Sequence, residues 1–133
     1  MKIQEKIDRA IEKNNSLLCV GLDSNSEKIP KHIKKQTKPQ FEFNKKIIDV
    51  TYDLVCAYKP NTAFYEERGA EGIKELKMTC DYLKENYPEI PIILDAKRAD
   101  IGNTNIGYAD FAFNYLEVDM LTVHPYLGKE SLA

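Results

Sequence analysis

The chain has 133 residues, which is enough for one domain with a hydrophobic core. With 43% hydrophobic and 30% charged residues it has the composition of a soluble globular protein, and the formal net charge of −2 argues against a nucleic-acid-binding or membrane-binding surface. No apolar run approaches the ~18 residues of a transmembrane helix, and the charged N-terminus is not that of a secretory signal.

Apolar residues at helical spacing and continuous apolar runs alternate along the chain. The helical pattern predicts helices over residues 2–14, about 41–55, about 69–86 and around 108–116. The apolar runs predict strands over residues 16–23, 56–64, 90–97 and 119–126. Residues 24–39 are polar, carry two prolines and are predicted to form a loop, and residues 128–133 look like the first turn of another helix.

Apolar strands that alternate with amphipathic helices are typical of an α/β fold with a parallel sheet and helices outside it. A spacing of about 35 residues per βα unit suits a (β/α)8 TIM barrel, which needs about 250 residues. We therefore expect residues 1–133 to form a single domain, the N-terminal half of a TIM barrel with its first four βα units. Since four strands would leave open sheet edges, we expect either a fragment of a longer protein or two half-barrels that assemble.

The three cysteines, Cys19, Cys56 and Cys80, each lie inside an apolar pattern. An odd number of cysteines without close spacing favours reduced thiols in a cytoplasmic protein. All three are predicted to be buried as small hydrophobic side chains.

Polar side chains follow each predicted strand at its C-terminal end, where active sites form in α/β barrels. These residues are Asp23 after the first strand, Lys59 after the second, Asp95, Lys97 and Asp100 after the third, and His124 after the fourth. For Asp23 a turn-forming role is the alternative. His124 is predicted to be a hydrogen-bonded barrel histidine, since no partner is visible in the sequence.

The third strand carries the densest charge. Because side chains alternate along a strand, Asp95 and Lys97 are predicted to share one face, and their pairing would offset the cost of desolvation. Lys59 can bracket Asp95 and Asp100 can bracket Lys97, which gives a row of alternating charges that keeps every group ionised. The alternatives are a structural ion pair for Asp95 and Lys97, a solvated loop acid for Asp100 and a surface lysine for Lys59.

Such a row suits the loss of an anionic group from a substrate. The carboxylate would destabilise the substrate's own negative charge, and the neighbouring lysine would protonate the resulting carbanion as a general acid. No metal is required, because lysines occupy the site. A magnesium ion held by Asp95, Asp100 and a phosphate remains the alternative. In "DIGNT", Gly102 allows close backbone approach, while Asn103 and Thr104 can bind a ligand or cap the next helix.

Four motifs together resemble the orotidine 5'-phosphate decarboxylase family, in its type 2 bacterial branch. They are "GLD" at 21–23, "YKPNTAFYE" at 58–66, "LDAKRADIGNT" at 94–104 and "TVHPYLG" at 122–128. The resemblance covers nearly the whole chain. It implies a dimer of barrels that converts orotidine monophosphate to uridine monophosphate in pyrimidine biosynthesis, without a cofactor.

The resemblance also implies roles for individual residues. Lys59, Asp95, Lys97 and Asp100 would be the catalytic charges, with Lys97 donating the proton to C6 and Asp95 facing the substrate carboxylate.

The implied substrate-binding residues are Asp23 and Lys59, which would bind the ribose, together with Ile101 and Thr104. Asp100 and Thr104 would reach into the partner subunit's site.

The family's phosphate and pyrimidine contacts lie in the second half of the barrel, and they have no counterpart in these 133 residues. Two alternative functions therefore stay open. One is a magnesium-dependent sugar-phosphate decarboxylase of the same superfamily, and the other is an inactive half-barrel.

Overall fold

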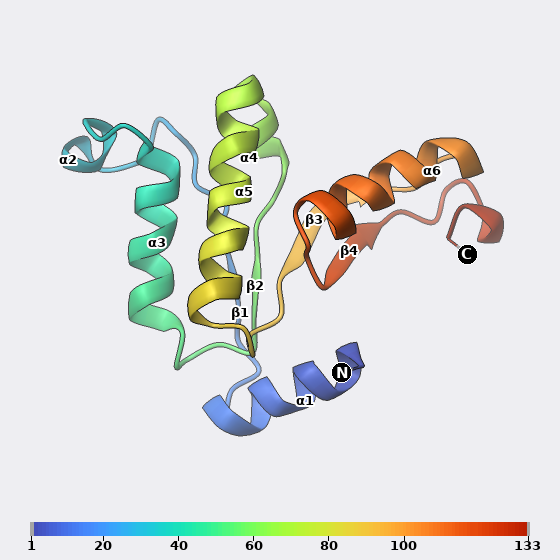
Figure 1. The fold of residues 1–133 in the computed structure, drawn as a ribbon, viewed down its shortest axis with the longest axis horizontal. Helices are drawn as coiled ribbons and strands as arrows, with labels where there is room; N and C mark the ends of the chain where they lie inside the picture. Colours follow the sequence, from blue (N-terminus) through green and yellow to red (C-terminus); the bar gives the residue numbers. More distant parts are fainter. Residues whose placement is uncertain (1, 133) are drawn as a thin grey trace.

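A computed structural model describes residues 2–132 of the chain (Figure 1). The elements in chain order are α1 (Ile3–Asn14), β1 (Cys19–Gly21), α2 (Lys31–Lys34), α3 (Pro39–Thr51), β2 (Ala57–Lys59), α4 (Ala63–Glu66), α5 (Gly69–Asn86), β3 (Ile93–Arg98), α6 (Gly102–Ala109), the π-helix η1 (Asp110–Tyr115), β4 (Met120–Val123) and the 3₁₀ helix η2 (Lys129–Leu132). The predicted alternation of strands and helices is confirmed.

The four strands follow one another in chain order. β1 pairs with β2 and β3 pairs with β4, both in parallel. Backbone hydrogen bonds join the pairs: Tyr58 N–H donates to Pro91 O at 3.0 Å, Asp95 N–H donates to Pro60 O at 2.9 Å, and Thr62 N–H donates to Asp95 O at 3.1 Å. The carboxyl ends of the strands therefore lie along one rim, as in one side of a barrel.

The helices cover one face of these strands. α3 and α5 lie side by side next to β1 and β2, and α1 lies across the opposite end of the strands from the rim (Figure 1). The core between strands and helices includes Tyr58, Leu76, Leu83 and Leu94, each with at most 1% of its surface exposed. Residues 2–132 contain no helix with both the length and the hydrophobicity needed to cross a bilayer.

Two short helices lie where the sequence predicts a loop and part of a strand. α2 lies in the segment predicted to be a loop, and α4 begins at Ala63, inside the end of the predicted strand 56–64. The second strand ends at Lys59 because the chain turns at Asn61, whose side-chain Oδ1 accepts the N–H of Ala63 at 3.1 Å. Helices of four residues are too short to show helical periodicity.

The prediction that all three cysteines are buried is wrong for Cys19. Cys80 is buried, and burial raises the pKa of its thiol to about 12, whereas Cys56 is half-buried and Cys19 is exposed. Cys19 lies on the same face of the β1–β2 pair as Lys59, since the register places Gly21 opposite Lys59 two residues further along. An apolar run alone cannot show that only one face of its strand is covered.

A buried carboxylate anchors the start of α3. Glu75 of α5 is 1% exposed, and its Oε2 accepts the backbone N–H groups of Gln40 at 2.8 Å and Phe41 at 2.9 Å. Arg68 Nη2 lies 2.6 Å from Glu75 Oε1. The carboxylate thus serves two of the N–H groups that a helix start leaves unpaired, and the arginine compensates its charge.

The start of α3 also forms hydrogen bonds with the loops at the carboxyl ends of the strands. The Gln40 side-chain amide donates to Ser24 O, which follows β1, and to Phe64 O, which follows β2, both at 2.8 Å. Tyr65 OH donates to Leu22 O at 2.8 Å. These bonds tie the loop that carries Asp23 to the helical layer.

We predict that Glu75→Ala lowers the free energy of unfolding by about 2–4 kcal/mol, because it leaves two N–H groups without an acceptor and removes the carboxylate that compensates the charge of the largely buried Arg68. Glu71→Ala on the same helix is the matched control, since Glu71 forms only an exposed ion pair with Lys38. Urea unfolding of the two variants measures the difference. Equal losses in both variants would contradict the role assigned to Glu75.

Candidate active site

Lys59, Asp95 and Lys97 meet at the carboxyl ends of β2 and β3. Lys59 Nζ donates to Asp95 Oδ2 at 2.6 Å, and Lys97 Nζ donates to Asp95 Oδ1 at 2.7 Å. The Asp95 side chain is 10% exposed, whereas the Lys97 side chain is 67% exposed. The structure therefore confirms that the two lysines lie on either side of the acid, as predicted. Most of the Lys97 side chain stays exposed.

A bulge in β3, rather than simple alternation, directs Lys97 toward Asp95. The register of β3 with β4 is interrupted between Leu94 and Arg98, and Lys97 has a positive φ of 48°. A positive φ is uncommon for a residue with a side chain and costs about 1–3 kcal/mol, so the surrounding contacts must hold it. Bulges of this kind re-aim side chains next to active sites.

One contributor to the cluster was missed from the sequence. Thr122 of β4 donates its hydroxyl hydrogen to Asp95 Oδ1 at 2.9 Å. As a β-branched residue inside a strand, Thr122 resembles an ordinary packing residue. The only available signal was a hydroxyl in the otherwise apolar run "MLTV", immediately before the polar end of the strand.

The environment of Asp95 keeps its carboxyl ionised. Burial by itself would raise the pKa, but the hydrogen bonds from Lys59, Lys97 and Thr122 outweigh burial, so the pKa of Asp95 lies well below its ordinary value. The same hydrogen bond with Asp95 raises the pKa of Lys59. The cluster is therefore a fixed arrangement of one negative and two positive charges near neutral pH.

Asp23 lies beside this cluster but outside its hydrogen bonds. It is exposed at the end of β1, next to Leu22, whose N–H donates to Lys59 O at 3.1 Å. Its negative charge adds to the raised pKa of Lys59, after the larger effect of the hydrogen bond with Asp95. Its position agrees with the predicted rim location.

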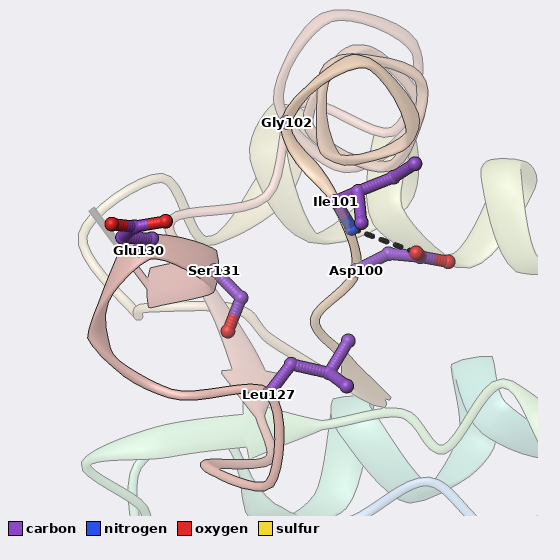
Figure 2. Close-up of a pocket in the computed structure, with 6 residues that line it drawn as sticks. All are labelled: Asp100, Ile101, Gly102, Leu127, Glu130 and Ser131. Atoms are coloured by element: carbon purple, nitrogen blue, oxygen red, sulfur yellow. Dashed lines mark hydrogen bonds between the residues drawn. The ribbon is translucent and has the colours of Figure 1, made fainter.

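Asp100 does not pair with Lys97, and the predicted fourth charge of the row is wrong within this chain. Among residues 2–132 no ion pair joins the two side chains. Instead the Asp100 carboxylate accepts the N–H of Ile101 at 2.7 Å (Figure 2). Asn105 closes the turn, since its Oδ1 accepts Asp100 N–H at 2.8 Å and its Nδ2 donates to Asp100 O at 2.9 Å. The chain turns into α6 directly after this point, and the Asp100 carboxylate is bonded to Ile101 N–H rather than to its own Lys97.

The beginning of α6 forms part of a separate cavity. Its lining residues are Asp100, Ile101, Gly102, Leu127, Glu130 and Ser131 (Figure 2). Ile101 is 65% exposed, and Thr104 is half-buried in the first turn of the helix. Asn103 Oδ1 accepts the N–H of Thr104 at 3.0 Å, so Asn103 makes a local bond within that turn.

His124 is not part of the charged cluster. Its backbone N–H donates to Arg98 O at 3.1 Å, and its half-buried ring accepts the N–H of Tyr126 at Nδ1, at 3.4 Å. This arrangement agrees with the expected hydrogen-bonded histidine.

The side chains do not form a metal-binding group in the part of the chain that the structure describes. Within residues 2–132, no three His, Cys, Asp or Glu side chains come together as metal ligands. Asp95, one of the two carboxylates of the magnesium alternative, already has both oxygens bonded to lysines, and Asp100 accepts the N–H of Ile101. The geometry therefore gives the magnesium alternative no support.

Parallel strands in chain order, outer helices and a charged cluster at the strands' carboxyl ends define one half of a TIM barrel. A family model, described as "Orotidine 5'-phosphate decarboxylase / HUMPS family", matches residues 16–133. The chain belongs to this family. The first four βα units of a (β/α)8 barrel, expected from the sequence, are confirmed.

Individual relatives agree with this membership. An orotidine 5'-phosphate decarboxylase of Parabacteroides distasonis is 49% identical over 129 residues, which cover 97% of this chain and 46% of the relative. One of Cellvibrio japonicus is 51% identical over 134 residues, covering 99% and 48%. A candidate orotidine-monophosphate-decarboxylase crystal structure from Toxoplasma gondii is similar with a TM-score of 0.87 and 38% identity, covering 96% of this chain and 42% of that one. The chain thus spans less than half the length of these proteins.

We predict that Lys59→Met raises the pKa of Asp95, because it removes one of the two lysine hydrogen bonds. In the unfolded chain an aspartate titrates near pH ~3.9. In the folded chain the pKa of Asp95 is lower than this, so its ionised form stabilises the fold above the unfolded pKa. That stabilisation is lost as the pH falls through the folded pKa. Lys59→Met should therefore move the acid loss of stability to higher pH.

The measurement is the ¹³C shift of the Asp95 carboxyl against pH, with acid unfolding followed in parallel. Lys45→Met is the control, because Lys45 pairs with Asp49 on α3, away from the cluster. Identical Asp95 titrations in the Lys59→Met variant and the unaltered chain would contradict this explanation of the low pKa.

Proposed function

We propose that the protein to which residues 1–133 belong is an orotidine 5'-phosphate decarboxylase, which converts orotidine monophosphate to uridine monophosphate and carbon dioxide in pyrimidine biosynthesis. The observation that carries this proposal is the Lys59–Asp95–Lys97 cluster at the rim of a parallel α/β fold. The relatives that bear this name, at about half of all positions identical, support it.

The cluster suits this reaction. The ionised Asp95 would lie against the substrate carboxylate, and the repulsion between the two charges is relieved as the C6–carboxylate bond breaks and neutral carbon dioxide leaves. The electron pair of that bond stays on C6 as a carbanion. The Lys97 ammonium, held within 2.7 Å of Asp95, would stabilise the developing charge and then donate its proton to C6. Water would return the proton to the Lys97 amine, so the residues act without a cofactor.

Asp23 and Lys59 are proposed to bind the ribose hydroxyls. Both lie at the rim, and the exposed Asp23 carboxylate can accept hydrogen bonds that Lys59 can complement as a donor. In this arrangement Lys59 would contact both the substrate and Asp95.

Asp100, Ile101 and Thr104 are proposed to complete the active site of a second subunit in a homodimer. The support is that, among residues 2–132, the Asp100 carboxylate forms no ion pair with its own Lys97, and that Ile101 leaves 65% of its surface exposed beside a cavity. These three residues would then act on a substrate bound by the partner's cluster.

Residues 1–133 are proposed to be the N-terminal part of a single barrel domain, with the phosphate contacts in a second part. The chain's match to less than half of each relative supports this. Remote phosphate contacts provide binding energy that is used in the transition state, so activity should need both parts. The inactive half-barrel remains the alternative for these residues alone. We propose a cytoplasmic location, in line with the composition and thiols.

Lys97→Ala in the intact protein should lower the rate of uridine monophosphate formation by at least about 10³-fold, because the reaction loses its general acid. Lys45→Ala is the matched control and should keep its activity. The assay follows product in the presence of a chelator, which separates this proposal from the magnesium-dependent alternative. Unchanged turnover in Lys97→Ala, or complete loss of wild-type activity with the chelator, would contradict the proposal.

Mixing two inactive variants tests the shared site. If Asp100 serves the partner's site, a mixed dimer of Lys97→Ala and Asp100→Ala subunits has one intact site and one doubly altered site. With random mixing, about a quarter of the wild-type activity should return. Activity that stays at the level of the separate variants would show that Asp100 does not act across the dimer.

A further inference from the structure

We infer that Thr122 is a positioning residue for the charged cluster: its hydroxyl group holds the Asp95 carboxylate and the bulged backbone of Lys97 in a single arrangement. The consequence for catalysis rests on the proposed decarboxylase function, whereas the structural part does not.

The Thr122 hydroxyl has all of its hydrogen-bonding positions in use. Its oxygen accepts the backbone N–H of Ala96 at 3.1 Å and that of Lys97 at 3.0 Å. A hydroxyl has two acceptor positions and one hydrogen. With both acceptor positions taken by N–H groups, the hydrogen is directed to Asp95 Oδ1, which lies 2.9 Å away.

Thr122 also replaces part of the strand pairing. β3 and β4 pair at Leu94 opposite Leu121 and again at Arg98 opposite Val123. Residues 95–97 of β3 therefore lie opposite Thr122 alone, and a normal ladder has no backbone acceptor for the extra N–H groups. The side-chain oxygen supplies that acceptor, so the bulge is stabilised by a side chain rather than by backbone pairing.

This arrangement couples the position of the Asp95 carboxylate to the position of Lys97, the proposed proton donor. The bulge gives Lys97 its positive φ and turns its Nζ back toward Asp95. The same hydroxyl fixes the oxygen of Asp95 that Lys97 contacts. A shift of Thr122 would therefore move the carboxylate and the proton donor together, which is the control a positioned general acid requires.

Three strands place groups against Asp95. Lys59 comes from β2, Lys97 from β3 itself and Thr122 from β4, and Asp23 after β1 acts only through its charge on Lys59. Of the three hydrogen-bond donors, Thr122 alone is uncharged. Replacing it therefore changes the geometry of the cluster without changing its net charge.

Amide hydrogen exchange tests the structural part directly. In the unaltered protein the amides of Ala96 and Lys97 should be protected, although the Lys97 side chain is mostly exposed. Thr122→Val should speed their exchange at least about tenfold, because it removes their acceptor. Thr122→Ser should keep the protection. The amides of Asp95 and His124, which bond to Pro60 O and Arg98 O, are internal controls for folding.

Fast exchange at Ala96 and Lys97 in the unaltered protein would overturn the inference without any variant. The inference is likewise overturned if Thr122→Val leaves both exchange rates unchanged, or if it accelerates exchange at Asp95 and His124 equally.

Steady-state kinetics test the catalytic part. Thr122→Val should lower kcat for orotidine monophosphate by about 10- to 100-fold, with a much smaller change in KM, and should shift the acid limb of the pH profile upward as Asp95 loses a donor. Thr122→Ser should restore most of kcat. A loss confined to KM, or no rescue by serine, would overturn the positioning role. Absence of decarboxylation in the unaltered protein would instead refute the proposed function and leave the exchange test in force.

Discussion

The site depends on one electrostatic constraint: a carboxylate that is largely removed from water must remain ionised. Asp95 has a side chain only 10% exposed, so its charge is tolerable only with partners on both oxygens. Lys59, Lys97 and Thr122 provide them. Three features of the fold bring these donors to one carboxylate. They are the bulge in β3, its register with β4 and the position of β2.

The rest of the fold keeps the donors in place. The backbone bond from Asp95 N–H to Pro60 O sets β3 against the end of β2 one residue beyond Lys59. Behind the strands, Glu75 caps α3, and Gln40 holds the loops after β1 and β2. The buried polar side chains of the helical layer thus limit the movement of the loops that border the charged cluster.

Sequence reasoning succeeded where local pattern and position coincide. The long helix 69–86 and the approach of Lys59 to Asp95 could be predicted, because hydrophobic periodicity identifies the elements and parallel strands end along one rim. Features that depend on how distant strands pair could not be predicted from the sequence. Thr122 looks like any β-branched strand residue, and the bulge has no local signature. Asp100 is close to Lys97 in sequence, but within the turn closed by Asn105 its carboxylate bonds to Ile101 N–H instead.

Asp95 is a carboxylate without a proton, held by donors that carry all of the hydrogens in the cluster. Neutron diffraction from deuterium-exchanged crystals grown near neutral pH measures this directly. We expect three deuterons on each of Lys59 Nζ and Lys97 Nζ, one on Thr122 Oγ1 directed at Asp95 Oδ1, and none on either Asp95 oxygen. A deuteron on Asp95, or a neutral amine at Lys97, would contradict this distribution of hydrogens.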